Sequence, residues 1–153
     1  MRTLLVAITL TMLGSVSAAP VPKAPLDAAK AELAKLDGTW EIVSFTIQGI
    51  EVVDKLDAKL FITFKNGEFT WSNNEQPGKI VSIDPTKMPK EVDYAYTEGE
   101  NKGKTQKAIY KLDGDTFSDC FGEVGDDTRP KEFKSTKDND LTVIVYKRVK
   151  KKD

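Results

Sequence analysis

The sequence predicts an all-β fold, an antiparallel up-and-down β-barrel of about eight strands that follows one short N-terminal helix. After Gly38, short β-rich segments with alternating apolar residues succeed one another, and no helical segment separates them. Tight turns join them, of which "NG" at 66–67 and "DGD" at 113–115 are the clearest. A meander of this length leaves two exposed edges unless it closes, which favours a barrel, with a β-sandwich as the alternative.

The start of the chain is expected to be a secretory signal peptide. Arg2 precedes the short apolar run "LLVAITLTMLG", and small residues follow it, which places the cleavage site near Ala18. The apolar run is shorter than the roughly 20 residues that span a bilayer. The sequence therefore predicts a signal peptide over 1–18, a proline-rich leader over 19–25, one barrel domain over 26–153, no transmembrane segment and a secreted or periplasmic location.

Within the domain, "LDAAKAELAKL" (26–36) predicts the helix, with an apolar stripe of Leu26, Ala29, Leu33 and Leu36. Gly38 lies just past its end, where a left-handed C-cap is common. The expected strands cover 39–47, 60–64, 68–72, 79–83, a segment around 92–96, 105–112, 117–121, 131–135 and 141–149. The last two are expected to pair with each other across "KDND".

Composition excludes several classes of protein. The 23 basic and 24 acidic residues balance, so no basic field predicts nucleic-acid binding. The chain has no histidine, which removes histidine general bases, Ser-His-Asp triads and histidine metal ligands. Its one cysteine, Cys120, cannot form an internal disulfide or a thiolate zinc site and is expected to be a small buried apolar residue.

Acidic residues gather in the turns at 113–115 and 126–127, but their spacing does not match an EF-hand loop. Turn chemistry accounts for the Asp-Gly-Asp sequence without a metal. The sequence thus predicts no metal, no cofactor and no catalytic residue, and the protein is not expected to be an enzyme.

Gly38-x-Trp40, at the start of the first strand, resembles the lipocalin and fatty-acid-binding protein superfamily. In those barrels the tryptophan closes the bottom of the barrel and a basic residue from near the end of the chain packs over it. The resemblance therefore implies a structural plug of Gly38, Trp40 and Arg148, with Trp40 sharing a strand face with Ile42 and Ser44. A guanidinium over an indole contributes ~0.5–2 kcal/mol. The alternative is an exposed Arg148 in the basic tail "YKRVKKKD".

From 36 to 148 the chain also resembles a family of lipocalin-like domains in exported proteins of planctomycete-type bacteria. The stretches that carry this resemblance are "LDGTWEIVSFTIQG", "DPTKMPKEVD", "TEGENKGKT", "IYKLDGDTF", "CF" and "RPKEF", in that order. The family has no established activity, so the resemblance implies a lipocalin-like fold and export but no reaction.

Six aromatic residues lie on the strand faces expected to point inward: Phe64, Phe69, Trp71, Tyr94, Tyr96 and Tyr110. In an eight-stranded barrel such residues either fill the interior as a core or line a site for one small ligand. Both interpretations remain open from the sequence.

Asp119 alternates with Phe117 and Phe121 in one strand and departs from an otherwise apolar face. If it points inward, it joins the candidate ligand lining, and burial would raise its pKa or require a partner, for which Arg129 is the nearest basic residue. Acidic residues are rarely buried without partners, so a solvated Asp119 at a twisted strand end is the favoured expectation.

Two functions follow from these patterns. The first is an exported, lipocalin-like binding module for a small apolar or amphipathic molecule, expected to be a monomer. The second is a filled barrel that serves as a structural or protein-interaction domain in the cell envelope. A continuous apolar pocket of roughly 300 Å³ or more, open at one end, would favour the first.

Overall fold

The computed structural model describes residues 26–73 and 76–150, so the expected signal peptide and leader lie outside the described residues. Its elements are α1 (Leu26–Leu36), β1 (Gly38–Ile47), β2 (Ile50–Glu51), a 3-10 turn η1 (Val53–Lys55), β3 (Phe61–Lys65), β4 (Glu68–Trp71), β5 (Gly78–Asp84), β6 (Lys90–Tyr96), β7 (Thr105–Asp113), β8 (Thr116–Phe121) and β9 (Thr142–Arg148). Among these residues, no helix is long and apolar enough to cross a membrane.

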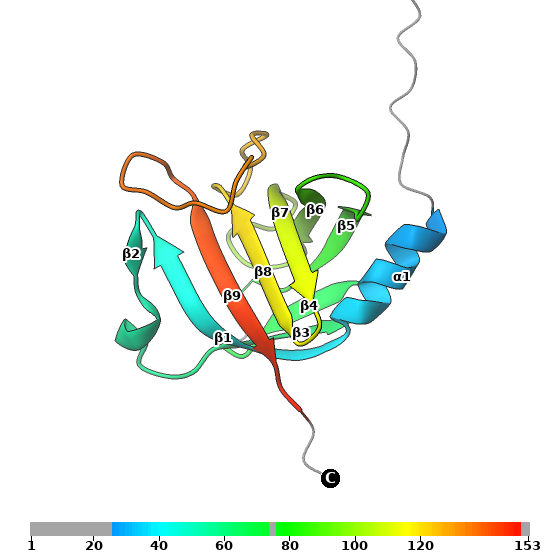
Figure 1. Ribbon diagram of the computed structural model, residues 1–153, viewed down its shortest axis with the longest axis horizontal. Helices are drawn as coiled ribbons and strands as arrows, with labels where there is room; N and C mark the ends of the chain where they lie inside the picture. The colour runs from blue at the N-terminus through cyan, green and yellow to red at the C-terminus, as the bar shows by residue number, and fades with distance from the viewer. Residues whose placement is uncertain (1–25, 74–75, 151–153) are drawn as a thin grey trace, which may run out of the picture.

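The described strands form a closed antiparallel barrel, which confirms the predicted fold class. The order is β2-β1-β3-β4-β5-β6-β7-β8-β9, and β1 also pairs with β9, so the sheet closes on itself (Figure 1). Eight strands make the barrel, and β2 extends it as a short hairpin with the far end of β1. Closure leaves none of the eight without a neighbour on either side.

Local sequence explains several of these elements. Asn66 and Gly67 have φ values of +54° and +81°, as the primed two-residue turn between β3 and β4 requires. Ile62 and Phe64 of β3 and Phe69 of β4 turn toward the core, in the period-two pattern of a half-buried strand.

The predicted strand over 131–135 is wrong. These residues form bends and irregular structure within the long connection from β8 to β9. Strand β9 instead pairs with β8 on one side and β1 on the other. Both edges of β9 are therefore occupied, and no free edge is left for residues 131–135 to join.

A β-bulge in β1 corrects the predicted strand face. The register with β9 shifts between Ile42 and Ser44, so the alternation of side chains changes there. Phe45 turns toward the core instead of Ser44, whose hydroxyl donates a hydrogen bond of 2.7 Å to Glu51. Ile42 and Phe45, three residues apart, thus lie on the same side of the sheet.

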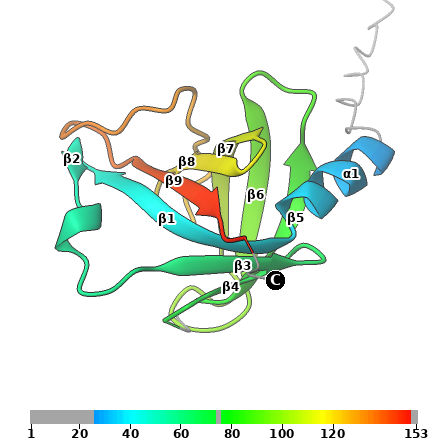
Figure 2. The ribbon, with the colours of Figure 1, turned by 60° about the horizontal axis from the view of Figure 1, so that its bottom comes forward.

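Helix α1 packs beside the end of the barrel where β1 begins and β9 ends (Figure 2). Leu36 is buried and Ala29 and Leu33 pack partly against the core, whereas Leu26 is 86% exposed, so the apolar stripe begins one turn later than predicted. The φ of Gly38 is +128°, and this residue starts β1 rather than forming a left-handed C-cap.

At this end of the barrel, Trp40 of β1 pairs across the sheet with Arg148 of β9. Trp40 is fully buried, and the Arg148 guanidinium carbon lies 4.0 Å from the centre of its rings. A Cβ on Gly38 would lie 3.0 Å from Arg148 Nη1, so the missing side chain leaves room for the guanidinium.

The same two side chains satisfy the last carbonyl groups of α1. Trp40 Nε1 donates to Leu36 O at 2.7 Å, and the Arg148 guanidinium donates to Lys35 O at 2.6 Å and Asp37 O at 2.8 Å. Carbonyl groups at a helix end have no partner within the helix, and a cation there also complements the helix dipole. The plug thus joins α1, β1 and β9.

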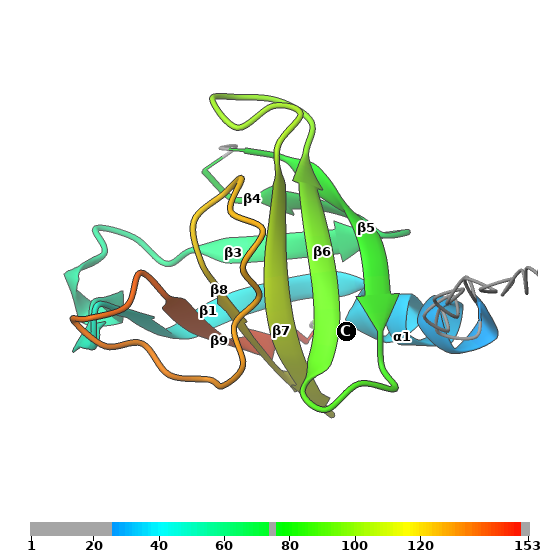
Figure 3. The ribbon, with the colours of Figure 1, turned by 90° about the horizontal axis from the view of Figure 1, so that it is seen from above.

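Glu32, which no sequence pattern singled out, also holds α1 against the barrel, where the helix lies beside β5 (Figure 3). Its carboxylate is buried and accepts hydrogen bonds from Lys90 Nζ at 2.6 Å, Lys35 Nζ at 2.9 Å and Tyr110 Oη at 3.1 Å. Burial alone would raise the pKa of Glu32, but these three donors outweigh it and hold the pKa below 4.5.

Strands β4 and β5 share few cross-strand residue pairs, and an aromatic ring packs over one of these pairs. Phe69 pairs with Gly78, and a Cβ on Gly78 would lie 2.5 Å from both the Phe69 ring and the Ala95 carbonyl oxygen. The ring of Phe69 therefore packs directly over the glycine backbone, where no other residue fits.

Replacing Trp40 by alanine should lower the free energy of unfolding by ~3–5 kcal/mol, because it removes the largest buried side chain and leaves a cavity beneath Arg148. Urea denaturation measures the change. A loss below ~1 kcal/mol would show that Trp40 does not close the barrel.

Gly78→Ala should destabilise the fold by ~1–3 kcal/mol, because the new methyl group displaces Phe69 or the β6 backbone. The matched control is Gly122→Ala, whose Cβ would lie 3.6 Å from Leu141 at ordinary contact distance. In urea denaturation the control should stay within ~1 kcal/mol of the parent protein. Equal effects of the two substitutions would contradict the close packing at Gly78.

Candidate functional site

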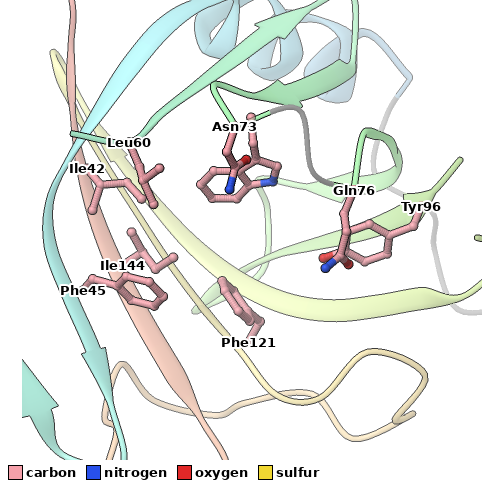
Figure 4. Close-up of a pocket in the computed structure, with 9 residues that line it drawn as sticks. Ile42, Phe45, Leu60, Asn73, Gln76, Tyr96, Phe121 and Ile144 are labelled. Carbon is pink, nitrogen blue, oxygen red and sulfur yellow. The ribbon is translucent and has the colours of Figure 1, made fainter. Parts of the chain in front are cut away.

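Figure 4 shows a pocket of about 240 Å³ and the side chains that line it. The pocket lies toward the end of the barrel where β1 ends and β9 begins, opposite the plug. Trp40 is near the start of β1, and Arg148 is the last residue of β9. The pocket is lined by residues farther along β1 and nearer the start of β9. Its lining residues come from five strands, the residue before β3 and the loop after β4: Ile42, Phe45, Leu60, Trp71, Asn73, Gln76, Tyr96, Phe121 and Ile144.

The bulge in β1 builds one wall of this pocket. Without it, Ile42 and Phe45 would face opposite sides of the sheet. With the register shift between Ile42 and Ser44, both side chains reach the pocket beside Ile144 of β9 (Figure 4). The wall is apolar because Leu60 and Phe121 complete it.

The opposite wall carries polar groups that are held in place. The Tyr96 hydroxyl donates to Gln106 Oε1 at 2.6 Å, and the Gln106 amide donates to Gly122 O at 2.7 Å. Gln76 accepts a hydrogen bond from the Asn101 side chain. These contacts fix the tyrosine ring against the pocket and connect β6, β7 and the end of β8.

Two other hollows lie outside the barrel wall. One, of about 440 Å³, lies beside α1 and is lined by Lys35, Lys90 and Arg148, whose charges are engaged with Glu32, Asp115 and backbone carbonyls. The other, of about 470 Å³, lies between η1 and the outward face of β1 around Glu41 and Val43. The pocket at the open end is the one built from inward-facing strand residues.

Below the pocket, Asp119 is buried, which contradicts the expectation that it is solvated. It is 4% exposed, and Oδ2 accepts a hydrogen bond from the Tyr94 hydroxyl at 3.2 Å. Strand β8 stays regular to Phe121, so its face does not twist outward and Asp119 keeps the inward direction of Phe117 and Phe121.

Asp119 Oδ1 and the Tyr146 hydroxyl are both buried and have no hydrogen-bond partner among the described residues. Tyr146 lies near enough to interact with the carboxyl but not in hydrogen-bond geometry. Burial raises the pKa of Asp119 to about 7, although its contacts with Tyr94 and Tyr146 oppose that rise.

Arg129, the nearest basic residue in sequence, does not pair with Asp119. Its guanidinium forms an ion pair of 2.6 Å with Asp93 and donates to the carbonyl oxygens of Val92 and Ala108. Arg129 thereby connects the β8–β9 loop to β6 and β7. Because its guanidinium is held there, it does not point into the barrel interior.

The seven candidate lining residues divide between two layers. Trp71 and Tyr96 line the pocket, whereas Asp119 lies one inward position below Phe121 on β8. The other four pack into the core around Phe117, whose ring lies 5.2 Å from Tyr146 in a stacked arrangement. These four are Phe64, Phe69, Tyr94 and Tyr110.

Sequence reasoning missed most of the lining. Phe121 and Leu60 lie on predicted inward faces and could have been chosen by position along the strand. Phe45 reaches the pocket only because of the bulge, and Asn73 and Gln76 reach it because of the conformation of the β4–β5 loop. Neither the bulge nor the loop conformation has a clear signal in the sequence.

The volume of the pocket limits what it can hold. Sites for drug-sized ligands usually measure about 300–1,000 Å³, while an apolar cavity of about 150 Å³ suffices for benzene. The pocket therefore fits a molecule of about one ring with a short substituent. Within residues 26–73 and 76–150, no three histidine, cysteine, aspartate or glutamate side chains gather as metal ligands would.

Comparisons of the chain with protein-family models, with curated proteins and with solved structures found no match.

Replacing Asp119 by asparagine should stabilise the protein at pH 8.5 and have little effect at pH 4.5. The carboxyl has an ordinary pKa of 3.8 but one of about 7 when folded, so between these values the native state holds a proton that the unfolded state has lost. Stability due to this group is thus highest below pH 4, falls as pH rises toward 7, and stays low above it. Asparagine removes that loss, on the order of 4 kcal/mol at most.

Urea denaturation at several pH values measures this effect. The control is Asp138→Asn, an exposed position with the same change of charge. If the parent protein and Asp119→Asn show the same pH dependence between 4.5 and 8.5, the carboxyl does not titrate as its burial requires.

Proposed function

We propose that this protein is an exported, lipocalin-like binding module that holds one small apolar or amphipathic molecule in the pocket at the open end of its barrel. The observation that carries the proposal is the pocket itself, about 240 Å³ between inward-facing side chains of an otherwise filled barrel. Apolar side chains that line an open pocket are in contact with water, and a small apolar molecule in the pocket would remove that contact, which favours an occupant.

The division of the barrel into two halves supports binding over a purely structural role. Around Trp40, the closed half is packed by aromatic rings, of which Phe117 contacts Trp40, Phe64, Tyr110 and Tyr146. This half supplies stability, so the open half does not need to be filled by the chain. A rigid scaffold that leaves a concave apolar site is the usual arrangement for small-molecule sites.

Membership of the lipocalin-like family of exported bacterial proteins is part of the same proposal. The Gly38-Trp40-Arg148 arrangement supports it, since the resemblance implied that a basic residue would pack over this tryptophan. Export rests on the expected signal peptide over 1–18. Binding without catalysis rests on the absence of histidine from the sequence and on the lack of any recognisable catalytic arrangement there.

The alternative is a barrel that acts in the envelope as a structural or protein-interaction domain with no small-molecule ligand. The observation that favours it is the pocket volume, which lies below the usual range for ligand sites. Under this alternative the pocket is a packing defect, and filling it should stabilise the fold without loss of any bound molecule.

Native mass spectrometry of the protein secreted by its own host tests the proposal, together with titration by ethylbenzene, a molecule of the right size. We expect a bound small molecule, or ethylbenzene binding observed by NMR, in the parent protein. Leu60→Trp, which fills the pocket from its wall, should abolish either.

Val81→Trp is the matched control, because Val81 is an exposed residue of β5. It should leave binding unchanged. The proposal fails if the parent protein carries no molecule and does not bind ethylbenzene, or if Leu60→Trp binds as well as the parent.

A further inference from the structure

Two carboxyl groups are buried among the described residues, and they differ in their partners. Glu32 accepts hydrogen bonds from the ammonium groups of Lys90 and Lys35. Asp119 has no lysine or arginine within ion-pair distance in the described chain; its one hydrogen-bond donor is the neutral Tyr94 hydroxyl. Buried charges in proteins are normally paired, so Asp119 stands out as a carboxyl whose counter-charge the chain does not supply.

Asp119 lies directly below the pocket. On β8 it is the next inward residue after Phe121, and across the sheet it pairs with Ile144; both of these line the pocket. Tyr96, which lines the pocket from β6, is close enough for the Asp119 charge to contribute to the rise of its own pKa to about 12, after the larger effect of burial.

Two unsatisfied polar atoms lie together at this level. Oδ2 of Asp119 is occupied by Tyr94, while Oδ1 and the Tyr146 hydroxyl have no hydrogen-bond partner among the described residues. A buried carboxyl oxygen without a partner costs free energy, and a donor brought by a ligand would recover it.

An ammonium group meets both needs. It supplies the missing positive charge and several N–H donors, and hydrogen bonds between ionised partners are about twice as strong as neutral ones. The hydroxyl oxygens of Tyr94 and Tyr146 beside the carboxyl can accept further hydrogen bonds from the N–H groups of the ammonium. The pocket above offers Phe45, Leu60 and Phe121 to an apolar body.

We propose that the pocket binds a small amphipathic amine, with its apolar body between Phe45, Leu60 and Phe121 and its ammonium group donating to Asp119. This inference rests on the proposed function and adds the chemical class of the ligand. In the alternative, a proton or a buried water satisfies Asp119 and the pocket takes neutral molecules of the same size.

The groups around Asp119 allow pH to separate these cases. The side chains that face or adjoin it are Tyr94 and Tyr96 of β6, Tyr146 of β9 and Cys120 of β8. Burial raises the pKa of each, to about 12 for Tyr96 and about 11 for Cys120. None of them changes charge between pH 5.5 and 8, so a change in amine binding over that range reports on Asp119.

The test is a titration of the purified protein with benzylamine, benzyl alcohol and ethylbenzene, three probes of nearly equal size, followed by NMR. At pH 8 we expect benzylamine to bind at least about tenfold more tightly than ethylbenzene. At pH 5.5 this preference should disappear, because Asp119 holds its proton. Asp119→Asn should lose the preference at pH 8 and still bind ethylbenzene, while Asp138→Asn should behave like the parent.

Each outcome decides one question. If no probe binds the parent protein, the proposed function fails. If the probes bind equally at pH 8, or if Asp119→Asn keeps the preference for benzylamine, the amine inference is overturned and the binding function stands. The pH profile of the parent protein alone gives the same decision should the variant fail to fold.

Discussion

The pairing of β1 with β9 at Trp40 and Arg148 is the contact on which the rest of the structure depends. It closes the sheet, and in the same place it satisfies the last carbonyl groups of α1. The end of α1, the start of β1 and the end of β9, which comes much later in the sequence, therefore meet at one pair of side chains. The indole provides burial and the guanidinium provides donors, so neither residue could replace the other.

This closed end explains how the barrel can hold an empty space at the other. Aromatic rings around Phe117 fill the half next to Trp40, and Glu32 fixes α1 over the same half through Lys90 and Tyr110. The other half keeps a pocket bounded by Phe45, Leu60 and Phe121.

Between the two halves lies a polar layer, whose tyrosine rings also pack in the core. Asp119, Tyr94 and Tyr146 bring a carboxyl and two hydroxyl groups together where apolar side chains would pack without penalty. The chain satisfies one carboxyl oxygen and leaves the other, and burial raises the pKa of Asp119 to about 7. Under the proposed function, this layer would select a ligand with a polar head group.

The amino-acid sequence by itself determined the fold class, the helix, the tight turn at Asn66 and most strand positions, because these follow from local periodicity and backbone preference. The contact between Trp40 and Arg148 was predicted from the resemblance that the Gly38-x-Trp40 motif carries. Tertiary structure alone decided the rest. The bulge after Ile42 turned Phe45 inward, and the occupied edges of β9 left residues 131–135 without a strand to join. The burial of Asp119 was also beyond local reasoning, since its environment comes from β6 and β9, which only barrel closure brings together.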